Sequence, residues 1–265
     1  MAASACQRIT LVFAFFFFAG LSQAAFSQSP INIEQLLTKP SVWQISSSVD
    51  YRGSSLGSFQ NGRQLTGSTG LRYGLTPRVE INARLTGWQY RQSVGELQSE
   101  EQGHSVSIGG NWLLKRESLL PAMLLEARGE LLSRGSPEER SFPGGSVGLT
   151  LYKSSDPVVL SLRASMNLRR SYRFESVKVS PGATWSIEPG VNFAVNANVT
   201  LFGSAFFERR NASLHDGVTL YNAQERVGLR GGLALAVAGR HSLFVSGDLA
   251  SDQQGGVSLQ WFYEF

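Results

Sequence analysis

The sequence predicts an all-β protein, a transmembrane antiparallel up-and-down β-barrel of about twelve strands with a short N-terminal helix or plug. Three observations support this fold class. After Pro40, apolar and polar residues alternate in about twelve separate segments, and a period of two is that of a strand with one apolar face. The connections between these segments alternate between short and long. The last ten residues form one more such segment, which ends on the apolar Phe265.

Residues 1–24 have the pattern of a secretory signal peptide. Arg8 supplies a positive charge, residues 11–20 are an apolar segment of signal-peptide length, and Ala24 ends a small-x-small cleavage pattern. The apolar segment is too short for a membrane anchor. The only cysteine, Cys6, precedes it, so the mature chain would have no disulfide and no thiolate metal ligand. The mature chain also has no apolar stretch long enough for a transmembrane helix.

Residues 25–40 differ from the barrel, which is expected to span residues 41–265. Ser29-Pro30 is suited to begin a short helix and Pro40 to end it. Two interpretations are open for this segment. It is either a plug or periplasmic contact, or a frayed leader.

Each expected strand is defined by its own alternation. The clearest is 158–169, where Leu160 and Leu162 face one way while Ser161 and Arg163 face the other. In chain order the expected strands lie at 43–52, 65–74, 79–85, 106–114, 123–131, 147–151, 158–169, 185–193, 199–207, 226–235, 243–249 and 257–265.

The connections are sorted by length. Short turns are expected near 75–78, 115–120, 154–157, 195–198 and 238–241, and longer polar loops near 53–62, 91–103, 133–144, 170–181, 209–224 and 251–255. Outer-membrane barrels have short periplasmic turns and longer external loops, so both termini would lie on the periplasmic side. Aromatic residues then gather at two levels, with Trp43, Tyr73, Trp112 and Tyr263 near the periplasmic ends and Tyr51 and Trp185 near the outer ends.

Charged residues occupy many of the positions predicted to face the lumen. The expected pore-lining residues are Arg52, Arg72, Glu80, Arg84, Glu126, Arg128, Arg163, Arg169, Glu188, Arg226, Arg230 and Asp248. Because guanidinium groups bind carboxylates and phosphates bidentately, an arginine-rich wall would favour anions. The alternative is that arginines and acids pair across the lumen and simply hold the wall together.

The C-terminal strand resembles the closing strand of bacterial outer-membrane β-barrels. Leu259, Trp261, Tyr263 and Phe265 form its apolar, aromatic face, and polar residues lie between most of them. This resemblance implies that the membrane is a bacterial outer membrane.

Three further segments resemble a particular group of outer-membrane barrels: GLRYGLTPRVEI at 70–81, DPVVL at 156–160 and PGVNFAVNANVT at 189–200. The group comprises the meta-pathway phenol-degradation-like transporters and the barrel of the functional-amyloid (Fap) secretion pore. The likeness covers residues 40–265 and implies an outer-membrane pore or transporter, with no cargo named. The amyloid pore has a coiled coil before its barrel, whereas roughly 16 residues here are too few for heptads, which argues against amyloid export.

No catalytic residue, metal site or cofactor is expected. An outer-membrane lipid hydrolase would need a Ser–His pair, and the histidines are His104, His215 and His241. His104 is adjacent to Ser105 on an expected strand, so the two side chains would face opposite ways. The sequence shows no metal-ligand spacing, phosphate loop or nucleophile elbow.

Together these patterns predict an outer-membrane pore or transporter that passes small or extended anionic solutes through an Arg/Glu-lined lumen. An export channel or assembly barrel that acts with periplasmic partners is the main alternative, and a lipid hydrolase is a more distant one. The expected partners are membrane lipid, lipopolysaccharide, the outer-membrane assembly machinery and a periplasmic protein. The formal charge of +4 comes from arginines spread over alternating positions, which indicates lumen lining rather than a nucleic-acid surface.

Overall fold

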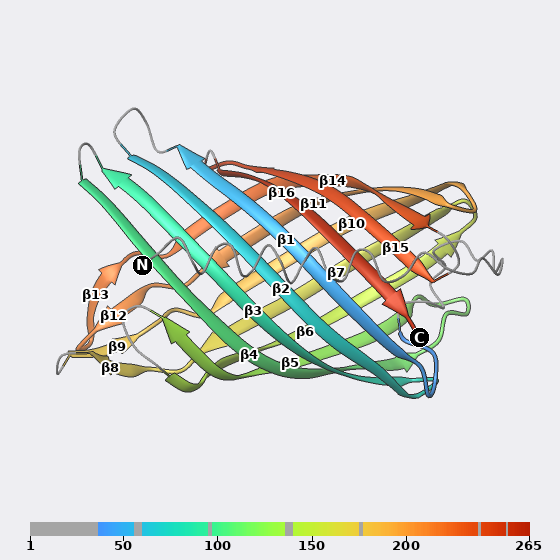
Figure 1. The fold of residues 1–265 in the computed structure, drawn as a ribbon, viewed down its shortest axis with the longest axis horizontal. Helices are drawn as coiled ribbons and strands as arrows, with labels where there is room; N and C mark the ends of the chain where they lie inside the picture. The colour runs from blue at the N-terminus through green and yellow to red at the C-terminus, as the bar shows by residue number, and fades with distance from the viewer. Residues whose placement is uncertain are drawn as a thin grey trace.

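The computed structural model describes residues 37–265 except 56–59, 95–96, 136–139, 175–176, 238–239 and 253. In this part of the chain sixteen strands are present, and twelve of them form one closed antiparallel barrel (Figure 1). The predicted fold class is therefore confirmed. The expected helix start at Ser29-Pro30 and the signal peptide lie outside the described residues. No helix in the described ranges is long and apolar enough to cross a membrane.

The barrel strands follow the predicted order along the chain. They are β1 (Trp43–Ser55), β2 (Gln60–Thr76), β3 (Val79–Val94), β4 (Leu97–Lys115), β5 (Ala122–Gly135), β6 (Arg140–Ser155), β7 (Val158–Arg169), β10 (Thr184–Asn196), β11 (Val199–Arg210), β14 (Gln224–Val237), β15 (His241–Ala250) and β16 (Gln254–Glu264). Each strand pairs with the barrel strand before it and the one after it, and β1 pairs with β16 to close the ring.

The closing seam joins the two ends of the barrel sequence. Its register runs from Gln44 opposite Glu264 to Ser54 opposite Gln254. Beyond the ladder, the Phe265 amide donates to the Trp43 carbonyl at 2.9 Å and the Trp43 amide donates to the Phe265 carbonyl at 3.3 Å. The seam therefore leaves no unpaired strand edge, as a structure that spans a membrane requires.

The outer wall of the barrel is an apolar belt. The outward side chains of Leu160 on β7, Ile187 on β10 and Leu249 on β15 are more than half exposed. The inward side chains of Thr150 on β6 and Thr200 on β11 are buried. A soluble protein does not expose a continuous ring of large apolar side chains. Hydrocarbon is the solvent that suits this surface, with polar residues kept on the lumen side.

Aromatic side chains mark the end of the belt near the C-terminus. The ring of His241 lies 4.7 Å from that of Tyr263, Tyr263 stacks on Phe265 at 5.9 Å, and Trp261 Nε1 donates to His241 Nδ1 at 3.2 Å. Leu259 shares this outward face and is 46% exposed. The structure thus places the four residues of the predicted closing signature on the lipid side of the seam.

The predicted loops were too long on the side of the external connections. Where loops were expected at 53–62, 91–103, 133–144 and 251–255, strands continue until only 56–59, 95–96, 136–139 and 251–253 separate them. Arg91 and Glu100, for example, are paired across β3 and β4 and lie 3.3 Å apart. These strand ends extend beyond the apolar belt, where both faces meet water, so the alternation of apolar and polar residues stops although the backbone ladder continues.

Two other predicted loops contain a small second sheet. Loop 170–181 holds β8 (Tyr172–Phe174) and β9 (Val177–Ser180), and loop 209–224 holds β12 (Ser213–His215) and β13 (Val218–Tyr221). These strands pair in the order β13-β12-β9-β8. The two loops therefore form one sheet at the external end of the barrel (Figure 1).

Residues 37–42 enter the barrel as an ordered segment against β2. Pro40 bridges Gly74, the Ser41 amide donates to the Gly74 carbonyl at 2.8 Å, and the Gly74 amide donates to the Val42 carbonyl at 3.2 Å. A Cβ at Gly74 would overlap the backbone carbonyl oxygens of Thr38 and Lys39. Position 74 must therefore lack a side chain if this contact is to form.

We expect Gly74→Ala to lower the free energy of unfolding by about 1–3 kcal/mol, because the added methyl forces backbone apart in a packed contact. Gly67→Ala on the same strand is the matched control, since a Cβ there meets nothing within 4 Å. Urea unfolding of the barrel in lipid vesicles, followed by tryptophan fluorescence, gives both values. Equal midpoints for the two variants would show that the segment does not press on Gly74.

Candidate functional site

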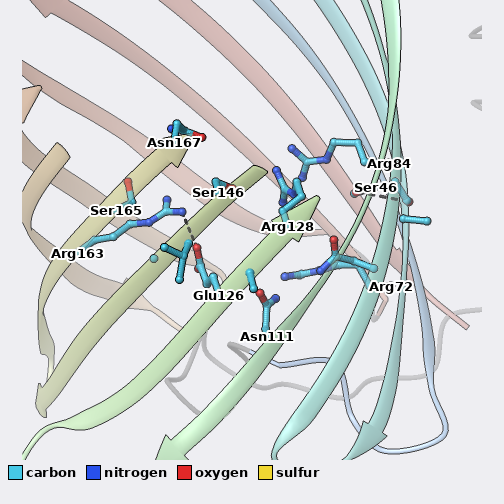
Figure 2. Close-up of a pocket in the computed structure, with 16 residues that line it drawn as sticks. Ser46, Arg72, Arg84, Asn111, Glu126, Arg128, Ser146, Arg163, Ser165 and Asn167 are labelled. Atoms are coloured by element: carbon cyan, nitrogen blue, oxygen red, sulfur yellow. Dashed lines mark hydrogen bonds and ion pairs between the residues drawn. The ribbon is translucent and has the colours of Figure 1, made fainter. Parts of the chain in front are cut away.

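The lumen contains a polar cavity of about 390 Å³ on the side of the barrel formed by β1 to β7 (Figure 2). Side chains that surround it and project inward in the figure come from several of these strands: Ser46, Arg72, Arg84, Asn111, Glu126, Arg128, Ser146, Arg163, Ser165 and Asn167. Period-two alternation places all of them on the inner face.

Small inward residues make room for the cavity. Gly70 on β2 and Gly148 on β6 have no side chain, and Ser46 and Ser146 have short ones. Long side chains from neighbouring strands extend over the two glycines, Arg84 over Gly70 and Glu126 over Gly148. A Cβ on Gly70, for instance, would lie 3.7 Å from Arg84 Nε. The space is therefore set by the contrast between large and small inward residues.

Two of the cavity's four arginines are paired with acids. Arg72 Nε lies 3.0 Å from Glu80 Oε1, and Arg163 Nη2 donates to Glu126 Oε2 in the ion pair drawn in Figure 2. For Arg72 and Arg163, the geometry agrees with the alternative interpretation, in which arginines and acids pair and hold the barrel wall together.

The other two arginines, Arg84 and Arg128, have no such partner. Among the described residues no carboxylate oxygen lies within 4.0 Å of either guanidinium, and neither takes part in a hydrogen bond there. Figure 2 shows both extending toward the same space. Glu80 and Glu126 form ion pairs with Arg72 and Arg163, whereas Asp50 and Glu126 act on Arg84 and Arg128 only from beyond ion-pair distance. The cavity lining therefore keeps a net positive charge.

Glu80 organises the wall behind Arg72. Its side chain is fully buried, and Oε1 accepts a hydrogen bond from Asn111 Nδ2 at 2.8 Å as well as facing Arg72. Oε2 accepts two bonds from Thr38, from the amide at 2.7 Å and from Oγ1 at 2.8 Å. One carboxylate therefore joins β2, β3 and β4 to the segment that precedes the barrel.

Four of the other predicted lining residues form two groups outside the cavity. Glu188 Oε1 accepts bonds from Arg230 at 2.8 Å and Ser204 at 2.7 Å. Arg226 lies 3.7 Å from Asp248 and 3.4 Å from Asp252, distances of an ion pair rather than a hydrogen bond.

Arg52 and Arg169 are exposed near the external ends of β1 and β7, and neither lines the cavity. The structure thus gathers Arg72, Arg84, Glu126, Arg128 and Arg163 around one space, while the other predicted residues lie elsewhere.

Several cavity and wall residues were not among the predicted pore-lining residues. Asn82, Asn111 and Asn167 have the inward parity that the alternation predicts, but an uncharged amide gave no signal of its own for a role in the site. Phe206 is buried on the inner face of β11, with the guanidinium carbons of Arg226 and Arg230 at 5.3 and 5.5 Å from its ring centre. An inward aromatic residue breaks the expected pattern of apolar outside and polar inside.

The three histidines lie far from one another in the topology. His104 is on β4, His215 on β12 of the external sheet and His241 in the outward aromatic cluster with Trp261. Among the described residues, no group of three or more His, Cys, Asp or Glu side chains is placed to hold a metal ion.

No protein-family model matches the sequence, and no curated protein matches it. Solved structures do. An outer-membrane channel from Pseudomonas putida F1 superposes with a TM-score of 0.65 at 13% identity, over 89% of this chain and 100% of that one. The transport unit of the autotransporter AIDA-I from Escherichia coli gives 0.54 at 11% identity, over 89% and 94%. The CymD monoaromatic hydrocarbon channel gives 0.51 at 9% identity, over 92% and 95%.

These similarities are to channels and transport units rather than to enzymes, and at such identities they speak for the fold. They confirm the outer-membrane barrel part of the resemblance stated above, and they do not single out the phenol-degradation-like or amyloid-secretion group. With its closed ladder and apolar belt, the chain has the fold of an outer-membrane β-barrel and is located in a bacterial outer membrane.

Proposed function

We propose that this barrel is a channel for small or extended anionic solutes, with the cavity between β1 and β7 as its selectivity site. The observation that carries the proposal is the pair of guanidinium groups, Arg84 and Arg128, that face the cavity without a carboxylate partner. Pores use such fixed charges to select ions of the opposite sign. The channel fold of the solved structures supports transport in general, and the preference for anions rests on these side chains.

The cavity has the chemistry of a weak anion site. A guanidinium group presents donors in a planar fork that fits carboxylates and phosphates. Around the two free arginines, Asn82, Asn111 and Asn167 add amide groups that can bond to a solute's polar atoms. A solute can thus exchange its bound water for several polar contacts, and its affinity for the site stays weak enough for it to leave again.

The narrower resemblance to phenol-degradation-like transporters remains part of this proposal, without a cargo. The size of the cavity is compatible with a small organic anion, because pockets for small molecules begin at roughly 300 Å³. A barrel of about twelve strands is wider than the filled eight-stranded barrels and narrower than the sixteen-stranded open porins. We therefore expect solutes to pass one at a time through a narrow lumen rather than through a wide water-filled pore.

The test is the ion preference of the mature protein in a planar lipid bilayer. A salt gradient across the bilayer gives the reversal potential, whose sign tells whether anions or cations carry the current. We expect steady steps of current with a reversal potential on the anion side. A cation-selective or unselective current would contradict the role of the arginines, and protein of proven β-structure that carries no current at all would contradict the channel.

A further inference from the structure

The external end of the barrel bears a second group of cations, separate from the lumen. Arg170, Arg173, Lys178 and Arg209, here called the outer basic cluster, lie on β8, β9 and the adjoining ends of β7 and β11, and all four are exposed. They belong to the two predicted loops that join into one small sheet. The proposed channel function makes no use of them.

Two members of the cluster face each other directly. Arg173 is the register partner of Lys178 across β8 and β9. Like charges at directly opposite positions destabilise a sheet. Asp216 lies close by, with its carboxylate accepting the backbone amide of Lys178 at 2.8 Å, but among the described residues it forms no ion pair with the Lys178 or Arg173 side chain, and the turn at 175–176 lies outside those residues. An external anion between the two cations would remove the repulsion.

Arg209 is only weakly neutralised. Its one ion-pair partner in the described part of the chain is Glu225, at 3.6 Å, and both side chains are more than half exposed. Exposed pairs at this distance contribute little and exchange readily. Arg170 has no ion-pair partner among the described residues. The cluster therefore retains net positive charge in this structure.

Contacts on the small sheet show which way its faces point. The ring of Tyr172 lies 4.0 Å under the guanidinium carbon of Arg140, and Arg140 pairs with Ser133 at an inward position of the barrel. Tyr172, its register partner Val179, which is buried, and His215 thus share the face turned toward the barrel mouth. Neighbouring residues on a strand point to opposite faces, so Arg173 and Lys178 are turned away from the mouth.

The cluster also lies at a defined height above the membrane. The last outward apolar residues on this side are Leu168, Trp185 and Phe207, each at least 40% exposed. Trp185 is the register partner of Arg209, and Arg170 follows Leu168 by two residues. The cations therefore begin where the apolar belt ends, which is the depth of the headgroups, and interfacial Trp anchors this level.

We propose that the outer basic cluster binds the phosphate groups of lipid A, the membrane anchor of lipopolysaccharide in the outer leaflet. Guanidinium groups hold phosphates by bidentate charge-assisted hydrogen bonds, and an ammonium group adds a point charge. A lipid source is favoured over a free anion on its way to the channel because the sheet turns these side chains away from the mouth. Binding here holds together two loops that are far apart in the sequence.

The test compares three forms of the full mature barrel in detergent: the natural protein, the variant Arg173→Gln/Lys178→Gln/Arg209→Gln, and the control Arg63→Gln/Arg91→Gln. The control also removes exposed cations, but from β2 and β3. Native mass spectrometry measures the binding of diphosphorylated lipid A, of lipid A without phosphates, and of inorganic phosphate. Circular dichroism and heat-modifiable gel mobility establish that each form is folded.

We expect the natural protein and the control to bind diphosphorylated lipid A at least ten times more tightly than the dephosphorylated form, and the triple variant to lose most of that difference. Equal binding by the triple variant would overturn the proposal, as would equal binding of the two lipid forms. Displacement of lipid A by millimolar inorganic phosphate would also overturn it, in favour of a free-anion site. Channel current depends on residues of the lumen, whereas lipid A binding depends on the outer basic cluster. A channel without anion selectivity would therefore contradict the proposed function and leave the expected lipid A binding unchanged.

Discussion

Replacing Arg84 and Arg128 together with glutamate is expected to reverse the ion preference of the channel. Two positive charges of the natural cavity have no ion-pair partner among the described residues, and the double variant turns them into two negative charges next to Glu126. Charges a few ångströms from a permeating ion act through a medium less polarisable than water, so a change of about 1.4 kcal/mol per ion, a factor of ten in permeability ratio, is a modest expectation. The measurement is the reversal potential in a bilayer under a salt gradient.

The control for this experiment changes the same number of charges elsewhere. Arg78 and Arg116 are exposed at the short turns, outside the cavity, and Arg78→Glu/Arg116→Glu gives an equal change in net charge. We expect this control to keep the anion preference within about twofold, because exposed charges farther away than a Debye length are screened. If both double variants shift the reversal potential equally, overall charge decides selectivity and the cavity does not.

Replacing Glu80 with alanine is expected to have the largest effect on stability. The change leaves Arg72, Asn111 and the Thr38 amide without their shared acceptor in a buried place. Removing one partner from a buried ion pair costs about 3–5 kcal/mol, and because Arg72 itself is 27% exposed we expect about 3 kcal/mol. Urea unfolding in lipid vesicles measures the loss.

Glu126→Ala is the matched comparison for Glu80→Ala. Glu126 is also a luminal glutamate paired with an arginine, but its side chain and that of Arg163 are 28% and 48% exposed. Water can replace the lost partner there, so we expect no more than about 1 kcal/mol. Similar losses of unfolding free energy for the two variants would mean that the buried hydrogen bonds and ion pair of Glu80 do not stabilise the barrel more than an exposed pair does.

Alternation along the sequence was enough to predict the barrel. Whether a residue such as Leu160, Arg163 or Leu229 faces outward or inward follows from its odd or even position within its strand, and no long-range information is needed. The same parity predicted that Arg72, Arg84 and Arg128 face inward. It did not predict which of them lack a partner, because that depends on neighbours across strands and on the reach of flexible side chains.

Features that depend on contacts between distant segments were missed. The bond from Thr38 to Glu80 joins residues 42 positions apart, and nothing in the composition of either segment indicates it. The external sheet pairs β9 with β12, and these strands, of four and three residues, are too short to show a period. In both places backbone geometry and packing decide the structure, and the pattern of apolar residues says little.

The seam between β1 and β16 has a practical consequence for anyone who wishes to attach a label to this protein. Because Phe265 exchanges backbone hydrogen bonds with Trp43, a peptide fused to the C-terminus would begin directly at the seam that closes the barrel. The turn at Asp216–Gly217 lies at the opposite, external end and is exposed, with a glycine at φ 82°. A sequence inserted after Gly217 would be displayed on the cell surface without disturbing the pairing of β1 with β16. Exposed turns of this kind tolerate insertions best.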